Sequence, residues 1–269
     1  VWGLPCDKIQ SDWAAQRIKG LSLTTAVVNA LLGIKSSKSL IDSFHYPLKG
    51  PGMMWQRFRE AIEKRGGHVL LNAEVVGIEH SDWKISTVLV REGGRVSAFP
   101  AENLISSVPI NKLVALLKPT APPKVAEAAA HLAYRSFLIV CLIVDRKTLF
   151  PDQWIYVHSP EVKVGRIQNF KNWSPAMVPD PETTSIGMEY FCNEDDGLWN
   201  LPDEQLAELA AKELSTLGFA DCGEVIDHKV VRQPQAYPVY NQDFKKQLSV
   251  VKDFLAGIEN LQTIGRNGM

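Results

Sequence analysis

Residues 136–145 read SFLIVCLIVD, an apolar run bounded by a serine and an aspartate near the middle of the chain. The run is rich in β-branched side chains and far shorter than the ~20 residues that a membrane-spanning helix needs. It therefore predicts a buried β-strand. Further strand candidates follow it on the C-terminal side, at 153–158, 164–170, 183–191 and 224–234. Together they predict a sheet in which several strands are antiparallel.

Helical patterns surround this predicted sheet on both sides. A hairpin is expected around Gly93–Gly94, and short strands at 103–109 and 260–265. The fold class expected is α+β, with a mixed, largely antiparallel sheet and helices. Helices are expected from Asp12 to Gly33, at 53–65, where Met54, Phe58, Ala61 and Ile62 share one face, and at 110–118, 123–133, 203–217 and 243–257.

Composition and residue spacing argue against several classes of protein. With 29 basic and 30 acidic residues and no dense basic block, the chain does not look like a nucleic-acid-binding protein. The cysteines are far apart, without CxxC pairs, and the histidines lack the HExxH spacing, so neither a disulfide framework nor a metal site is expected. Reduced thiols, no membrane span and no signal peptide predict a cytoplasmic protein. The chain starts at Val1 and stops after a glycine turn, so we expect it to be a piece of a longer protein.

The stretch GRIQNFKNWSP, residues 165–175, concentrates polar side chains directly after an apolar segment. One interpretation is a strand that runs into an ordinary polar loop. The other is a strand whose end presents donors and a cation to an anionic, polyhydroxylated ligand. Its residues alone leave both open.

Motifs elsewhere combine glycines with the ends of predicted elements. YPLKGPG (46–52) precedes a helix, where free backbone N–H groups favour anions. AEVVGIEH (73–80) reads as a half-buried strand, NLISSVP (103–109) as a strand stopped by a proline, and IGRNG (264–268) as a strand entering a glycine turn.

In this order, the motifs resemble the serial signature of flavin amine oxidase-type proteins, over nearly the whole chain. The resemblance implies FAD as cofactor and attached parts of a Rossmann-like FAD-binding domain. It implies that the backbone of Val75 contacts the adenine of FAD. It also implies that the segments at the ends of the two short strands, 107–109 and 265–268, lie along the flavin. The cofactor-binding residues expected are Gly50, Gly52, Met53, Val75, Ser107, Val108, Pro109, Gly265, Arg266, Asn267 and Gly268.

A narrower resemblance links DWAAQRIKGLSL, GRIQNFKNWSPAMVP and AYPVYNQDF to UDP-galactopyranose mutases. It implies chemistry at a reduced flavin, with the protein binding and orienting a UDP-sugar. Two arginines would bind the diphosphate, assisted by tyrosine hydroxyls, and guanidiniums suit that role because they bind phosphate bidentately. The substrate-binding residues expected are Arg17, Tyr156, Arg166, Asn169 and Tyr237.

The chain lacks the GxGxxG fingerprint that holds the FAD pyrophosphate, so we do not expect this piece alone to retain FAD. Two alternatives stay open. One is an amine oxidase- or desaturase-like enzyme that transfers a hydride to FAD, and the other is a nucleotide-sugar-binding module without turnover. No side chain is indicated as a catalytic acid, base or nucleophile, and the oligomeric state is left open.

The expected domain organisation alternates between substrate-binding and FAD-binding segments. Residues 1–46 are assigned to a helical part of the substrate domain, and 47–109 to a partial FAD-binding region with a β-hairpin insertion. Residues 110–258 are assigned to the substrate-binding domain, and 259–269 to the start of a C-terminal FAD-binding segment.

Overall fold

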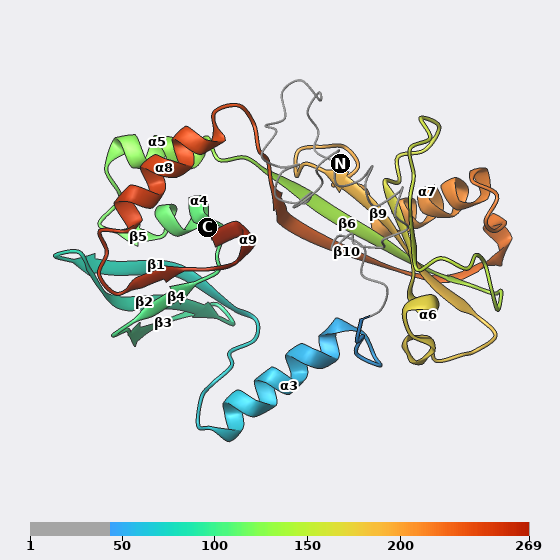
Figure 1. Cartoon of the computed structure of the whole chain (residues 1–269), viewed down its shortest axis with the longest axis horizontal. Coiled ribbons are helices and arrows are strands. Elements are labelled where there is room, and N and C mark those ends of the chain that lie inside the picture. Colours follow the sequence, from blue (N-terminus) through green and yellow to red (C-terminus); the bar gives the residue numbers. More distant parts are fainter. Residues whose placement is uncertain (1–43, 269) are drawn as a thin grey trace, which may run out of the picture.

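The computed structural model describes residues 44–268 (Figure 1). The helix expected from Asp12, together with Arg17 and Cys6, lies outside the described residues. Within them, no helix is long and apolar enough to cross a membrane.

A five-stranded sheet forms one half of the described structure, and all of its neighbouring strands are antiparallel. The strand predicted from SFLIVCLIVD is confirmed as β6, and each strand candidate after it is also found. In spatial order the strands are β10 (Val225–Pro238), β6 (Tyr134–Val144), β9 (Thr184–Cys192), β8 (Arg166–Asn169) and β7 (Trp154–Tyr156).

The two faces of this sheet differ in what covers them. Alternate side chains of β6, from Leu138 to Val144, are fully buried, and they form a core with helix α7 (Asp203–Thr216). Their neighbours in sequence, such as Ile139, point to the opposite face and are only half-buried. We call this second side the open face. Strand register places one row of residues across it, namely Tyr156, Arg166, Glu189, Ile139 and Val231.

The other half is built on a four-stranded sheet in the order β3-β2-β1-β5. The predicted hairpin is confirmed, because both glycines of its turn have the positive φ that such turns require. A second core joins this sheet to helices α4, α5 and α8. The elements are β1 (Ala73–Ser81), β2 (Lys84–Glu92), β3 (Arg95–Pro100), β5 (Leu117–Lys118), α4 (Ile110–Ala115), α5 (Pro123–Ala130) and α8 (Phe244–Leu255).

A separate pair of parallel strands joins two distant segments. Strand β4 (Leu104–Ser106) pairs with β11 (Leu261–Thr263), and Leu104 lies opposite Leu261. Because the pair is parallel, both strands end at the same edge. There β4 leads into Ser107–Pro109, and β11 leads into the short helix α9 (Gly265–Gly268).

The two cores divide the chain differently from the expected domains. Buried residues between 110 and 132 and between 251 and 258 belong to the core of the four-stranded sheet, although the expectation assigned these ranges to the substrate domain. The five-stranded sheet lies between them in sequence, as an insertion (Figure 1). We therefore propose domain boundaries near residues 133 and 239.

Helix α3 (Pro51–Lys64) has the predicted position, but none of its residues is buried. It begins after Gly50 and ends before Gly66, and both glycines have positive φ. The expected apolar face with Met54, Phe58 and Ile62 is present, yet these side chains are exposed. The helix crosses between the two halves without lying flat against either sheet (Figure 1). The remaining short helices are α6 (Phe170–Trp173), η2 (Pro175–Met177) and η3 (Cys222–Glu224).

Candidate functional site

Tyr156 and Arg166, both expected to bind substrate, lie directly opposite each other on the open face. They form the last residue pair of the β7–β8 ladder, and the guanidinium carbon of Arg166 lies 5.8 Å from the centre of the Tyr156 ring. Tyr156 is exposed, and the Arg166 side chain keeps 21% of its surface accessible. This pair therefore presents a phenol and a guanidinium at the surface of the sheet.

Glu189 fixes Arg166 from the neighbouring strand. Its side chain is 1% exposed, and Oε2 accepts a hydrogen bond from Arg166 Nε at 2.5 Å, while Oε1 accepts one from Gln168. Burial alone would lower the pKa of Arg166, but the hydrogen bond to Glu189 and its charge outweigh burial and raise it. Within residues 44–268 the hydrogen bond to Glu189 uses Nε of Arg166, so the terminal nitrogens of the guanidinium are not needed for this pair.

Most other polar residues of the 165–175 stretch stabilise the fold. Asn169 is buried and caps α6 by accepting a hydrogen bond from the Asn172 N–H, so we propose no substrate contact for it. The Lys171 ammonium donates to three carbonyl oxygens, and the Asn172 amide donates to two. Trp173 stacks on Tyr46 at 5.0 Å. The loop interpretation thus accounts for this part of the stretch, whereas the Arg166 side chain keeps part of its surface exposed.

Tyr237 extends the site towards the end of the chain. Its ring packs against Phe137 and Phe191, and the guanidinium carbon of Arg266 lies 5.2 Å from its centre. An electrostatic interaction with Tyr237 also contributes to the raised pKa of Arg166. Arg266, which the sequence assigned to the flavin, therefore lies beside an expected substrate-binding tyrosine.

The two segments expected along a flavin are brought together. Ile264 N–H donates to the Ser106 carbonyl at 2.9 Å, and a Cβ on Gly268 would meet that same oxygen at 3.1 Å. Asn267 connects them to the open-face sheet, because its amide donates to the Gln235 carbonyl and its own carbonyl accepts from the Tyr134 hydroxyl. Two buried oxygens nearby, Asn267 Oδ1 and Gln235 Oε1, have no hydrogen-bond partner among residues 44–268.

The other expected cofactor residues lie apart from this junction. Gly50 precedes α3, lies against Met177 and has positive φ, while Gly52 and Met53 follow in the first turn of the helix. Val75 is half-buried at a bulge in β1 and packs on the second core. Their roles stay predictions.

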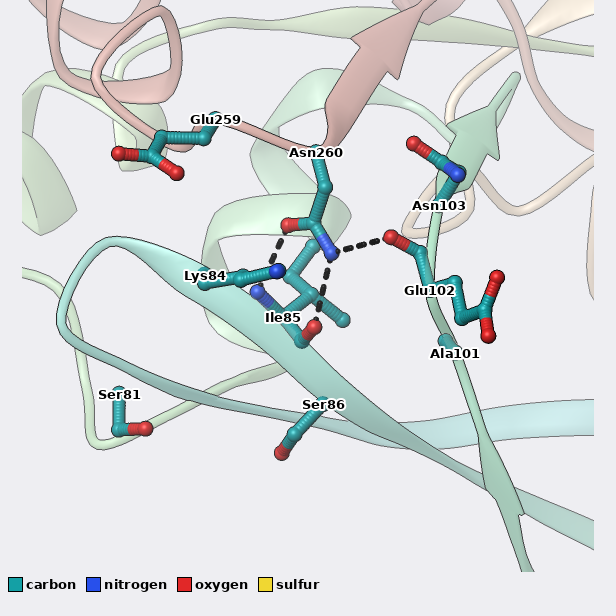
Figure 2. A pocket seen from close by; sticks show the side chains of 9 residues that line it. All are labelled: Ser81, Lys84, Ile85, Ser86, Ala101, Glu102, Asn103, Glu259 and Asn260. Carbon is teal, nitrogen blue, oxygen red and sulfur yellow. Dashed lines mark hydrogen bonds between the residues drawn. The ribbon is translucent and has the colours of Figure 1, made fainter.

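An open hollow of about 660 Å³ lies beside the turn that connects β1 and β2 (Figure 2). The Asn260 amide accepts a hydrogen bond from the Ile85 N–H and donates to the carbonyls of Ile85 and Glu102. These bonds satisfy the most buried polar side chain of the hollow, and the carboxylates of Glu102 and Glu259 lie on opposite sides of Asn260 (Figure 2). This arrangement explains local stability better than ligand binding.

Glu189 is the residue of the site that the sequence analysis missed. Its signal was an acid inside the run SIGMEYF, whose other members are mostly apolar, because a charge buried in a strand requires a partner. Among residues 44–268, no group of His, Cys, Asp or Glu is arranged to hold a metal ion.

The chain is similar to one protein family and to several solved structures. The family model described as flavin containing amine oxidoreductase matches residues 13–260. No curated protein sequence matches the chain. Among solved structures, a reduced UDP-galactopyranose mutase aligns over 99% of this chain and 57% of its own, with a TM-score of 0.75 and 17% identity.

Other solved structures share the fold at lower similarity. An oxidoreductase from Methanosarcina mazei aligns over 81% of this chain and 49% of its own, with a TM-score of 0.57 and 14% identity. The CLA-producing fatty acid isomerase from P. acnes aligns over 81% and 47%, with a TM-score of 0.54 and 15% identity. The chain thus spans about half the length of the structures that it resembles.

Proposed function

The chain belongs to the flavin-containing amine oxidoreductase family, and from this membership we propose that it forms the substrate-binding part of an FAD-dependent enzyme acting on a nucleotide sugar. Members of this family are FAD-dependent oxidoreductases. The nucleotide sugar is the finer part of the proposal, and the residues of the open face support it.

The observation that carries the proposal is the Tyr156–Arg166 pair at the edge of the open face. A guanidinium held by Glu189 through Nε is oriented before any ligand arrives, so binding does not have to order it. The tyrosine hydroxyl adds a donor beside it, and Arg266 adds a second cation across Tyr237. Two guanidiniums and two phenols suit a diphosphate better than a single carboxylate.

The residues at the β4–β11 edge fit a dinucleotide cofactor such as FAD. Ligands of α/β sheets bind beyond the carboxyl ends of parallel strands, which is where Ser107–Pro109 and Gly265–Gly268 lie. Glycine at 268 permits a close backbone approach there, and the unpartnered Asn267 Oδ1 could accept a donor of the cofactor. FAD, when bound, would supply the redox chemistry, while this chain would bind and orient the substrate.

A second candidate is hydride transfer from an apolar substrate. It is favoured by the aromatic part of the open face, where Phe137 and Phe191 pack at 5.5 Å beside Tyr237. It is also favoured by Glu189, because its charge opposes that of Arg166 and weakens the attraction of an anion. An enzyme of this kind would bind an apolar molecule and show no preference for UDP.

Calorimetric titration with UDP distinguishes the two candidates. A nucleotide-sugar site predicts saturable binding that Arg166→Ala weakens by about 1.5–3 kcal/mol, the contribution of a charged hydrogen bond. The matched control is Arg91→Ala, which removes an exposed arginine paired with Glu74 in the other sheet and leaves the affinity unchanged. Equal affinity of Arg166→Ala and the parent would contradict the proposal. UDP binding by a full-length protein without flavin turnover would instead indicate a binding module.

A further inference from the structure

A buried carboxylate on the core side of the five-stranded sheet, opposite the open face, accepts hydrogen bonds from the backbone just before Arg166. Glu213 lies on α7, faces the core and is 6% exposed. Its Oε1 accepts a hydrogen bond from the Lys163 N–H at 2.8 Å, and its Oε2 accepts from the Val164 N–H at 3.0 Å. The Tyr190 hydroxyl also donates to Oε2, at 3.1 Å.

These bonds hold the residues that lead into β8. Lys163 and Val164 are followed directly by Gly165 and Arg166. The Gly165 N–H donates to the Glu189 carbonyl at 2.9 Å, and a Cβ at Gly165 would meet the Phe191 ring at 3.0 Å. The backbone entering Arg166 is therefore fixed from the core side by Glu213 and from the open face by the Phe191 ring.

Strand β9 connects the two carboxylates. Glu189 and Tyr190 are consecutive, so their side chains point to opposite faces of the sheet. Glu189 holds the Arg166 guanidinium on the open face, while Tyr190 holds Glu213 in the core. Burial raises the pKa of the Tyr190 hydroxyl, and the charge of Glu213 and its hydrogen bond raise it further, so the phenol remains a donor at neutral pH.

We propose that Glu213 is a positioning residue for Arg166, acting through the backbone of residues 163–165. This inference rests on the proposed function of Arg166 in binding a diphosphate. A residue that only stabilises the core would affect UDP binding to the same extent whether or not Arg166 is present. A positioning residue affects ligand binding through Arg166, and its effect disappears when Arg166 is removed.

A double-mutant cycle with UDP as the probe tests this distinction. Glu213→Gln keeps the size of the side chain but replaces one acceptor oxygen by an NH₂ donor, so one of the two backbone N–H groups, of Lys163 or Val164, loses its acceptor. We expect UDP affinity to fall by roughly an order of magnitude in the parent chain. We expect no further fall in the Arg166→Ala background. The matched control is Glu208→Gln, an exposed acid on the same helix, which leaves affinity unchanged.

Each outcome decides a separate question. An equal loss in both backgrounds, or no loss in the parent, would overturn the positioning role of Glu213. An unchanged affinity in Arg166→Ala alone would overturn the proposed function instead. Amide hydrogen exchange at residues 163–166 needs no ligand: faster exchange in Glu213→Gln supports the inference, and unchanged exchange rejects it. If Glu213→Gln does not fold, Tyr190→Phe removes a single bond to Glu213 and is measured in the same way.

Discussion

Arg166 Nε and Glu189 Oε2 lie 2.5 Å apart on neighbouring strands, and Glu189 has almost no exposed surface. A buried carboxylate that has lost its cation is costly, and so is a guanidinium that has lost its counter-charge. This pair therefore connects the stability of the five-stranded sheet to the geometry of the candidate site.

Glu189→Ala should lower the free energy of unfolding by about 3–5 kcal/mol, because it breaks a buried ion pair from one side. The measurement is urea denaturation followed by circular dichroism. Glu60→Ala serves as the control, since it breaks the exposed pair with Arg57 and should cost at most about 0.5 kcal/mol. A similar small effect for both variants would mean that the Arg166–Glu189 pair contributes little.

Gly187→Ala should destabilise the chain by about 1–3 kcal/mol, since a Cβ at this position would meet the Phe170 ring at 2.8 Å and the Ile139 side chain at 3.2 Å. Gly197→Ala is its matched control, because nothing lies within 4 Å of a Cβ there. Thermal unfolding of both variants provides the comparison. Equal melting temperatures would show that the Phe170 ring moves aside at no cost.

Asn260→Ala should destabilise the four-stranded sheet by about 2–4 kcal/mol, because the Ile85 N–H and the carbonyls of Ile85 and Glu102 would lose a buried partner. Asn103→Ala, in the same hollow but at an exposed position, should change stability by less than about 0.5 kcal/mol (Figure 2). Chemical denaturation measures both. If the two variants were equally stable, water would be replacing the amide of Asn260.

Thiol reactivity should follow burial. Cys222 is exposed and should react first with a thiol reagent at pH 8, whereas burial raises the pKa of Cys141 and raises that of Cys192 to about 11. Under denaturing conditions every thiol should react. A thiol that stayed blocked after denaturation would contradict the expectation of reduced cysteines.

Cys192 should also make stability fall as pH rises from about 9 to 11. Between these values the thiol stays protonated in the folded state and loses its proton in the unfolded state, so the unfolded state is favoured. Tyrosines with raised pKa act in the same direction, so the test is a comparison of Cys192→Ala with the parent. The variant should lose part of the pH dependence, and identical slopes would exclude a contribution from this thiol.

The sequence predicted the elements well because their signals are local. The short, apolar and β-branched run SFLIVCLIVD indicates a buried strand, and Gly93–Gly94 supplies the positive φ of a hairpin turn. The pairing of Tyr156 with Arg166 is equally local, because one loop connects their strands.

What the sequence could not predict were relationships between distant segments. The partner of Arg166 is Glu189, which lies beyond a loop with its own short helices, and strand order cannot be read from spacing alone. Periodicity also identified the apolar face of α3 without indicating whether anything covers it. The same limit applied to Arg266, whose position beside Tyr237 depends on how the end of the chain returns to the sheet.

The bond between Ile85 and Asn260 spans 175 residues, with the whole five-stranded sheet between them. During synthesis the ribosome releases the four-stranded sheet and β4 long before Asn260 and β11 exist, so the hydrogen bonds of Asn260 to Ile85 and the β4–β11 pair form last. The inserted sheet consists of contacts that are closer in sequence, and it can form in the meantime. Premature termination within α8 would therefore release a chain whose inserted sheet is complete, while the core around Leu113 and Val251 never closes.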